Sequence, residues 1–191
     1  MNLCIIVPCF NEANRIPLND FGIFLSNFPK VSLHFVDDGS TDTTEYILYS
    51  FQKKYPQQVK IIKTTQNLGK GNAVFWGMSK ALENKEFDTL AFLDADLSAS
   101  PEECLYLAQK INPSVQYIFG SRIKKIDNLI ERRFFRFFVG RIVATAISKV
   151  LNIVVYDTQC GCKIFNRTTA EVAFDNPFIS DWLFDVEIFF R

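Results

Sequence analysis

The stretch "TLAFLDAD", residues 89–96, decides the fold because it joins an apolar run of strand length to two carboxylates. Side chains on an extended chain alternate between two faces, so Asp94 and Asp96 point the same way and their charges repel each other. Folding gives no reason for such a pair, whereas a divalent cation would turn the repulsion into attraction. Alternatively, the pair belongs to a solvated corner before a helix that begins at Ser100 and Pro101.

Other short runs of the same kind occur along the chain. They are apolar, contain β-branched or aromatic residues and end in polar residues or glycine: 3–8, 31–38, 59–64 and 115–121. Segments of helix length lie between them: 14–28, 41–55, 70–84 and 101–111. This alternation predicts an α/β fold, with a mostly parallel sheet covered by helices on both faces. A ligand should therefore bind beyond the carboxyl ends of the strands, where "PCFNE", "DDGS", "DAD" and "GSR" lie.

Length and composition favour one globular domain over residues 1–191. Hydrophobic residues make up 48% of the chain, and its 21 basic and 21 acidic residues balance, which argues against disorder and against a general affinity for nucleic acid. Five cysteines occur with only one histidine and without zinc-site spacing, so we expect reduced thiols. The final residues, "DWLFDVEIFFR", stop within an amphipathic pattern, and we expect the natural protein to continue beyond them.

One part of this neutral chain is strongly basic. Residues 122–149 hold eight basic and two acidic residues, a net charge of +6. Within segment 130–151 the apolar residues have helical spacing, and phenylalanines alternate with arginines. The segment is either a core helix with a charged face or an amphipathic helix that lies on an anionic lipid surface. No run of 18 residues is free of charge, so we expect no segment that spans a bilayer.

Three further motifs suit a nucleotide. In "VDDGSTDTT" (36–44) a helix cap explains Asp42 but neither Asp37 nor Asp38, one of which could accept an N–H of a base. In "VPCFNE" (7–12), Phe10 could form an apolar wall for a base, followed by two polar side chains. The glycine-rich "NLGKGNAVFWGM" (67–78) fails the spacing of both common phosphate loops, but it leaves Lys70 at a helix entry, close to any anionic ligand.

Together these motifs resemble those of family 2 glycosyltransferases. "IIVPCFNEANRI", "FVDDGSTDTT", "NLGKGNA", "LDADLS", "GSR" and "DTQCGCKIF" stand in the order and approximate spacing of that family, over residues 3 to about 188. They are most similar to the branch that acts on polyprenyl phosphates, and "DTQCGCKIF" followed by "WLFDVEI" favours its glucosyl type. The resemblance implies the GT-A fold. It also implies transfer of a hexose to a polyprenyl phosphate with inversion, with UDP-glucose as the favoured donor.

The resemblance also implies roles for individual residues. Pro8, Phe10, Asn11 and Glu12 would line the base and ribose, Asp38 with Asp37 beside it would read the base, and Lys70 and Asp94 would complete the nucleotide-sugar site. Asp94 and Asp96 would hold magnesium or manganese against the diphosphate. Arg122 and Lys163 would bind phosphate, and apart from the resemblance Arg132 and Arg133 are further cations available for the acceptor phosphate. Asp157 and Asp185 are candidates for orienting sugar hydroxyls or, with an alcohol acceptor, for acting as the base; alternatively, Asp185 caps a helix or pairs with a cation near the chain end. Two departures from the pattern are Ser98, where some relatives have glutamine, and Cys162, which replaces a common aromatic residue.

A phosphate acceptor simplifies the chemistry, because a phosphate monoester is largely dianionic at neutral pH and needs no general base. The site instead needs cations on the acceptor side. We expect a cytoplasmic protein, peripheral on or anchored to the cytoplasmic face of a membrane; its oligomeric state is left open. Two alternatives are a family 2 enzyme that glycosylates a saccharide hydroxyl and a module that binds nucleotide sugars without catalysis.

Overall fold

A computed structural model of the chain describes residues 1–120, 160–180 and 183–191. The chain divides into two units, and the first, Met1–Phe119 together with Gly161–Arg191, holds nearly all of the described residues. The basic segment 130–151 lies outside the described residues. The expectation of one domain over residues 1–191 therefore stays a prediction.

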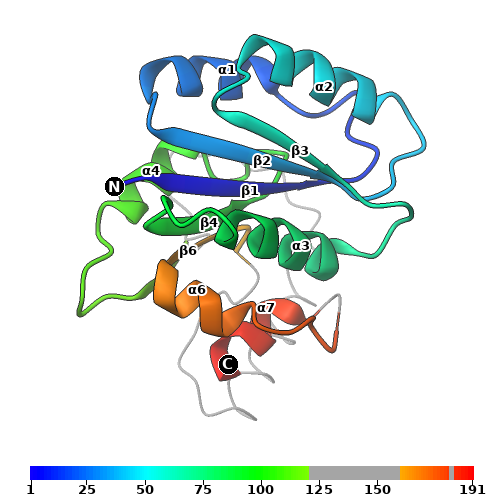
Figure 1. The fold of residues 1–191 in the computed structure, drawn as a ribbon. Helices are drawn as coiled ribbons and strands as arrows, with labels where there is room; N and C mark the ends of the chain where they lie inside the picture. The colour runs from blue at the N-terminus through cyan, green and yellow to red at the C-terminus, as the bar shows by residue number, and fades with distance from the viewer. Residues whose placement is uncertain (121–159, 181–182) are drawn as a thin grey trace, which may run out of the picture. The chain divides into compact units, whose positions relative to one another are not determined.

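The described part is built on a mixed, mostly parallel sheet (Figure 1). Its strands are β1 (Leu3–Cys9), β2 (Val31–Asp37), β3 (Val59–Lys63), β4 (Thr89–Leu93), β5 (Tyr117–Phe119) and β6 (Cys162–Asn166), arranged in the order β3-β2-β1-β4-β6-β5. Strands β1 to β4 pair in parallel, whereas β6 is antiparallel to both β4 and β5. This confirms the predicted α/β fold and adds a strand, β6, that sequence patterns did not indicate.

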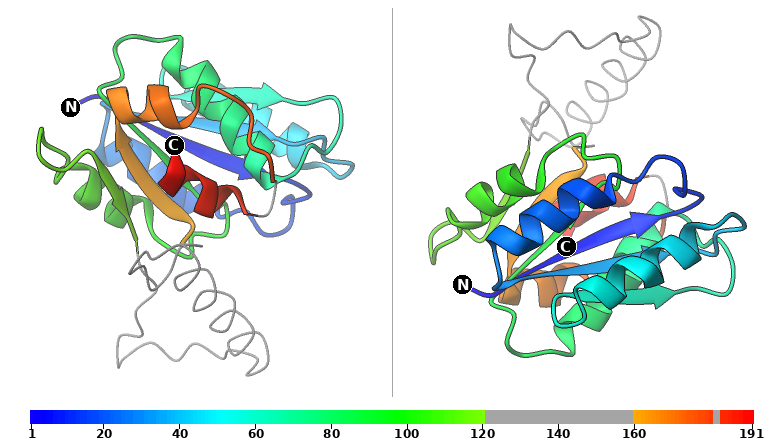
Figure 2. Two further views of the ribbon diagram at one scale, coloured as in Figure 1. Left: turned by 90° about the horizontal axis from the view of Figure 1, so that it is seen from below. Right: turned by 90° about the horizontal axis from the view of Figure 1, so that it is seen from above.

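Helices cover both faces of the sheet. They are α1 (Leu18–Asn27), α2 (Thr44–Lys54), α3 (Lys70–Leu82), α4 (Pro101–Ala108), α6 (Arg167–Ala173) and α7 (Phe184–Glu187), the last continued by the 3₁₀ turn Ile188–Phe190. Figure 2 shows α1 and α2 over one face, and α3, α6 and α7 over the other. On the second face, Ile6, Val36 and Phe92 from the strands pack with Val74 of α3 and Phe184 of α7. This core packs α3 against β1, β2 and β4.

Local signals explain where several elements begin. Ser100 and Glu103 form a capping box with Pro101 at the first turn, so α4 starts where the sequence predicts. Helix α1 begins later than expected, because the N–H groups of Arg15 and Ile16 donate to the Glu12 carbonyl in a separate turn. Among the described residues, no helix has both the length and the apolar character needed to cross a bilayer.

The five cysteines all fall within the described residues, where they are buried and not joined by disulfides. Burial raises the pKa of Cys9, next to the site, well above its ordinary value, and the negative charges of Glu12 and Asp37 raise it further. Cys9 is thus a neutral thiol of the core.

Candidate functional site

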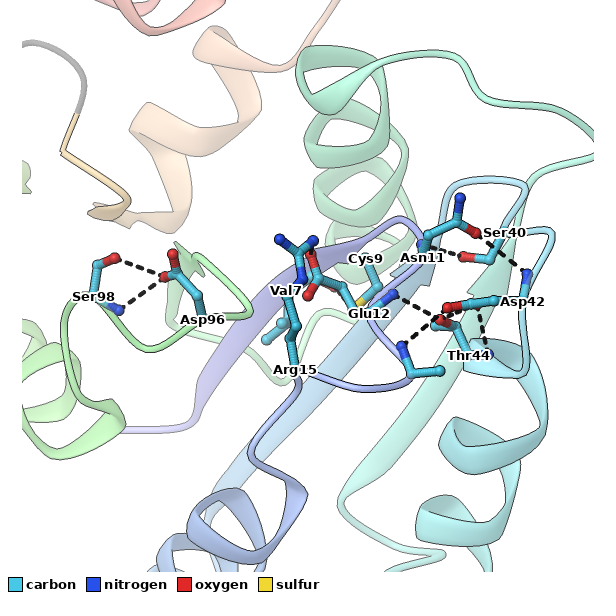
Figure 3. A network of polar contacts seen from close by, with 11 residues as sticks. Val7, Cys9, Asn11, Glu12, Arg15, Ser40, Asp42, Thr44, Asp96 and Ser98 are labelled. Carbon is cyan, nitrogen blue, oxygen red and sulfur yellow. Dashed lines mark hydrogen bonds and ion pairs between the residues drawn. The ribbon is translucent and has the colours of Figure 1, made fainter. Parts of the chain in front are cut away.

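The loops after β1 and β2 are joined by hydrogen bonds at the carboxyl edge of the sheet (Figure 3). Asn11 has a positive φ of 54°, donates its N–H to Ser40 Oγ (3.0 Å) and accepts at Oδ1 from the N–H groups of Thr41 (2.8 Å) and Asp42 (3.3 Å). Asn11 was predicted to contact the nucleotide, and its side-chain oxygen is engaged within the protein. Beside it, Phe10 is 40% exposed, so its ring is available to a ligand.

Glu12 joins this network through its backbone, while its side chain pairs with Arg15. Its N–H donates to Thr44 Oγ1 (2.8 Å) and its Oε1 lies 2.7 Å from Arg15 Nη2, while Oε2 is buried without a hydrogen-bond partner. Burial raises the pKa of Glu12; Arg15 opposes the rise, and the negative charge of Asp96 adds to it. An unpartnered carboxylate oxygen near a second carboxylate suits a ligand that brings a hydroxyl donor or a cation.

The two adjacent aspartates after β2 have different surroundings. Asp37 has no exposed area; its Oδ1 accepts from the Ser40 N–H (3.0 Å), and its Oδ2 is buried without a partner. Asp38 is 3% exposed and accepts from the N–H groups of Leu68 and Gly69, each at 2.9 Å. Asp38 was predicted to read the base, and in this geometry its carboxylate also holds the loop that precedes α3.

The acid pair follows β4 directly, with the buried Ala95 between its two members. Asp94 Oδ1 lies 2.6 Å from Lys70 Nζ, at the first residue of α3. Asp96 is exposed, and its Oδ1 accepts from the N–H (2.9 Å) and the Oγ (2.7 Å) of Ser98. Ser98 therefore orients Asp96. The sequence showed only that Ser98 stands where some relatives have glutamine, and it did not suggest this role.

Gly161 is a site residue that sequence reasoning missed. Its carbonyl accepts from the Asp94 N–H at 2.9 Å. A Cβ atom at position 161 would lie 2.1 Å from Asp94 Oδ2 and 2.3 Å from Cγ. Only glycine leaves room for this carboxylate, and the short motif "CGC" was the available signal.

Lys163 and Asp185 form a buried ion pair beneath the site. Lys163 has no exposed area, Asp185 is 5% exposed, and Lys163 Nζ contacts Asp185 Oδ1. Burial raises the pKa of Asp185, although Lys163 and Lys70 oppose the rise. Lys163 was predicted to bind the acceptor phosphate; its ammonium is buried against Asp185, and that role stays a prediction. The pair joins β6 to α7.

Several predicted site residues lie outside the described residues: Arg122, Arg132, Arg133 and Asp157. Of the other predicted residues, Pro8 lies on β1, Asp37 ends β2, Lys163 lies on β6 and Asp185 on α7, and the rest lie on the loops after β1, β2 and β4 or at the start of α3.

The residues present fit a magnesium or manganese ion. Within the described ranges no group of three or more His, Cys, Asp or Glu side chains forms a metal cluster. Asp94 and Asp96 offer hard oxygen donors, which suits a cation that takes one or two carboxylates and completes its shell with water and phosphate oxygens.

The α/β fold with its mixed, mostly parallel sheet matches solved GT-A glycosyltransferase structures. A mannosyltransferase from Pyrobaculum calidifontis, solved with GDP-Man and Mn²⁺, has this fold with a TM-score of 0.58 and 21% identity, over 90% of this chain and 46% of that one. Glucosyl-3-phosphoglycerate synthase from Mycobacterium tuberculosis, solved with Mn²⁺, UDP and glucosyl-3-phosphoglycerate, gives a TM-score of 0.66 at 18% identity, over 98% of this chain and 63% of that one.

The family model for glycosyl transferase family 2 matches residues 4–174, and the chain belongs to that family. Dolichyl-phosphate beta-glucosyltransferases are similar over nearly the whole chain. The protein of that name from Dictyostelium discoideum is 30% identical over 98% of this chain and 61% of its own length. The one from Drosophila melanogaster is 32% identical over 100% and 62%. The chain thus spans about three fifths of these curated relatives.

Proposed function

We propose that this chain transfers glucose from UDP-glucose to a polyprenyl phosphate with inversion at the anomeric carbon. The supporting observation is its similarity, over 98% and 100% of its length, to two dolichyl-phosphate beta-glucosyltransferases. The acid pair, the nucleotide-side loops and the cationic start of α3 are compatible with this reaction.

The donor would bind across the loops after β1 and β2. Pro8 and the exposed ring of Phe10 would contact the base, and the free oxygen of Glu12 would accept from a ribose hydroxyl. Asp38, with Asp37 beside it, would accept an imide N–H of the base, although Asp38 already accepts two backbone N–H groups. Lys70 would pair with the diphosphate, since its side chain is 40% exposed.

Asp94 and Asp96 would hold the magnesium or manganese ion. When bound, such an ion neutralises charge on the leaving diphosphate. Ser98 fixes the orientation of Asp96, and Gly161 leaves space for Asp94, so the chain positions both carboxylates in advance. Preorganised ligands of this kind lower the reorganisation needed during the reaction.

On the acceptor side the chain has to bring two anions together. Arg122, Arg132 and Arg133 are the candidate phosphate ligands, and all three lie outside the described residues. A dianionic acceptor requires no base, so neither Asp157 nor Asp185 has to accept a proton in this reaction. The lipid acceptor would place the protein at a membrane, on its cytoplasmic face.

The reaction can be tested with the full chain, radiolabelled UDP-glucose and a polyprenyl phosphate in detergent. We expect glucose in the lipid fraction, with a β linkage and dependence on added Mg²⁺ or Mn²⁺. Labelled product only with a saccharide acceptor would favour the polysaccharide alternative. Binding of UDP-glucose without transfer or hydrolysis would favour the binding module.

The metal role has its own experiment. Calorimetry should show UDP-glucose binding that strengthens with Mn²⁺ in the wild type and loses that gain in Asp96→Ala. Glu102→Gln removes an exposed acid just inside α4 and serves as the control, which should behave as the wild type. Equal affinities in all these measurements would refute the assignment.

A further inference from the structure

The strongest unexplained contact in the site is the ion pair between Lys70 and Asp94. Lys70 Nζ lies 2.6 Å from Asp94 Oδ1, and the two side chains are 40% and 27% exposed. The pair joins the first residue of α3 to the first residue after β4. The ammonium therefore occupies an oxygen of one of the two carboxylates that would hold the divalent cation.

The two partners differ in how firmly they are held. The backbone of Asp94 is bonded to Gly161, and its Oδ2 faces the space that glycine leaves open at position 161. Lys70 ends in a compact charge on a flexible four-carbon stem, in a side chain that is close to half exposed. A cation that approaches Asp94 would consequently displace Lys70 and leave the carboxylate in place.

Asp185 is a second negative charge that interacts with the Lys70 ammonium. The pKa of Asp185 responds to Lys70 as well as to Asp94, which places these three charges in one neighbourhood. Lys70 Nζ also lies 6.0 Å from the centroid of the Phe184 ring. Asp185 is already paired with Lys163, however, so a bound diphosphate would offer Lys70 the better new partner.

We propose that Lys70 is a displaceable counter-ion for Asp94, which competes with the divalent cation and moves to the donor diphosphate when both ligands bind. This inference rests on the proposed function for the identity of the metal and the donor. It predicts that the cation alone binds weakly. It also predicts that a nucleoside diphosphate strengthens cation binding by drawing Lys70 away from Asp94.

The test measures Mn²⁺ alone, by electron paramagnetic resonance of the free ion, on the full chain. Lys70→Met should bind Mn²⁺ about fivefold more tightly than the wild type, which corresponds to about 1 kcal/mol and suits a partly exposed ion pair. Lys80→Met is the matched control, because Lys80 lies on the same helix and forms a pair of equal length, 2.6 Å, with Glu83. That control should leave Mn²⁺ affinity within twofold of the wild type.

A second arm adds UDP. In the wild type, UDP should raise Mn²⁺ affinity by a larger factor than in Lys70→Met, because the variant has no counter-ion to remove. Unchanged or weaker Mn²⁺ binding by Lys70→Met would overturn the proposal, and so would an equal gain in Lys80→Met, since a general charge effect would then explain it. Circular dichroism checks that the variants are folded.

These outcomes are separable from those of the proposed function. If Lys70→Met binds Mn²⁺ more tightly but no glucolipid forms, the counter-ion role of Lys70 is supported and the polyprenyl-phosphate acceptor is rejected. If the wild type forms glucolipid but Lys70→Met binds Mn²⁺ as the wild type does, the acceptor is supported and the counter-ion role is rejected.

Discussion

At the scale of single residues, Gly161 shows how closely the backbone approaches the acid pair. A Cβ at this position would lie 2.1 Å from Asp94 Oδ2, so Gly161→Ala has to rotate that carboxylate or shift the chain. We expect a loss of Mn²⁺-dependent UDP binding of at least about tenfold, since one ligand of the ion would be misplaced. Calorimetry with and without Mn²⁺ measures it.

Gly22→Ala is the control for this change. Its Cβ would meet Tyr55 Oη at 2.8 Å, and that hydroxyl lies at the end of a side chain far from the acid pair along the sequence. Metal-dependent binding should persist in Gly22→Ala. If Gly161→Ala also retained it, the close approach to Asp94 would have no functional consequence.

Asp38 allows the second prediction at this scale. Its two oxygens accept from Leu68 and Gly69, whereas an amide has only one acceptor oxygen, so Asp38→Asn leaves one loop N–H facing an NH₂ group. The free energy of unfolding should fall by roughly 1.5–3 kcal/mol, the range for a hydrogen bond to a charged group. Urea denaturation measures this, and UDP binding should weaken as the start of α3 loosens.

Asp42→Asn is the comparison, because Asp42 is exposed and accepts from Thr44 and Ala13. It should lose less stability than Asp38→Asn. An Asp38→Asn protein with wild-type stability but altered preference between UDP and ADP would instead show that Asp38 serves the base alone.

The residue types in the site were largely readable from the sequence, but their partners were not. The apolar run predicted the acid pair at the end of a strand, but β4 ends at Leu93, and Asp94 and Asp96 lie in a turn rather than on the extended chain that was expected. The burial of Lys163 depends on the pairing of β6 with β4, which no local pattern encodes. The same holds for the contact of Gly161 with Asp94.

At the scale of elements, the strands that were predicted share long buried runs. β4 is entirely buried, and β1 is buried except at one residue. The two strands begin at Leu3 and Thr89, where the predicted runs 3–8 and 89–96 also begin. β6 was missed although "CKIFN" has the same length and the same order of apolar and polar residues as "VKIIK" of β3; its antiparallel partner β4 lies far away in sequence. The structure therefore adds the strand that carries Lys163.

That strand leads to a prediction about the buried pair. Asp185→Asn breaks the buried pair by removing the carboxylate that Lys163 Nζ contacts, and breaking such a pair typically costs about 3–5 kcal/mol of unfolding free energy. Adding Lys163→Met removes the remaining charge and should restore much of that loss. Urea denaturation of the wild type, both single variants and the double variant gives the coupling. Additive losses would mean that the two side chains do not depend on each other.

His34 on β2 gives the sheet a pH dependence. It is 6% exposed, lies 5.8 Å from the Phe87 ring, and burial lowers its pKa from 6.5 to about 4, with a further lowering from Lys60. The unfolded chain binds the proton more readily than the folded protein does. The contribution of neutral His34 to stability is therefore complete above pH 6.5 and is lost as the pH falls to about 4. The loss amounts to about 3 kcal/mol.

His34→Phe tests this by comparison of urea denaturation at several pH values between 7.5 and 4. The variant removes the titrating group, so its stability should fall less steeply than that of the wild type over this window. Parallel curves for the two proteins would show that His34 does not titrate in this range.

At the scale of the whole molecule, charge is distributed unevenly along the chain. The net charge of the chain is zero, yet residues 122–149 carry a net charge of +6. This stretch holds eight basic residues and several phenylalanines. A polyprenyl phosphate lies at a bilayer surface, so the proposed function requires the protein to reach that surface. The sequence offers segment 130–151 for the purpose, and this segment lies outside the described residues.

We therefore predict that the chain sediments with anionic vesicles at low salt and is released at high salt. Each basic residue near such a surface contributes about 1 kcal/mol, and salt screens the attraction. Changing Arg132, Arg133 and Arg136 together to Gln should abolish sedimentation with phosphatidylserine vesicles while thermal stability is kept. If the segment is instead a core helix with a charged face, the triple variant will lose stability and vesicle binding will not change. A wild-type protein that ignores anionic vesicles at low salt would rule out docking through this segment.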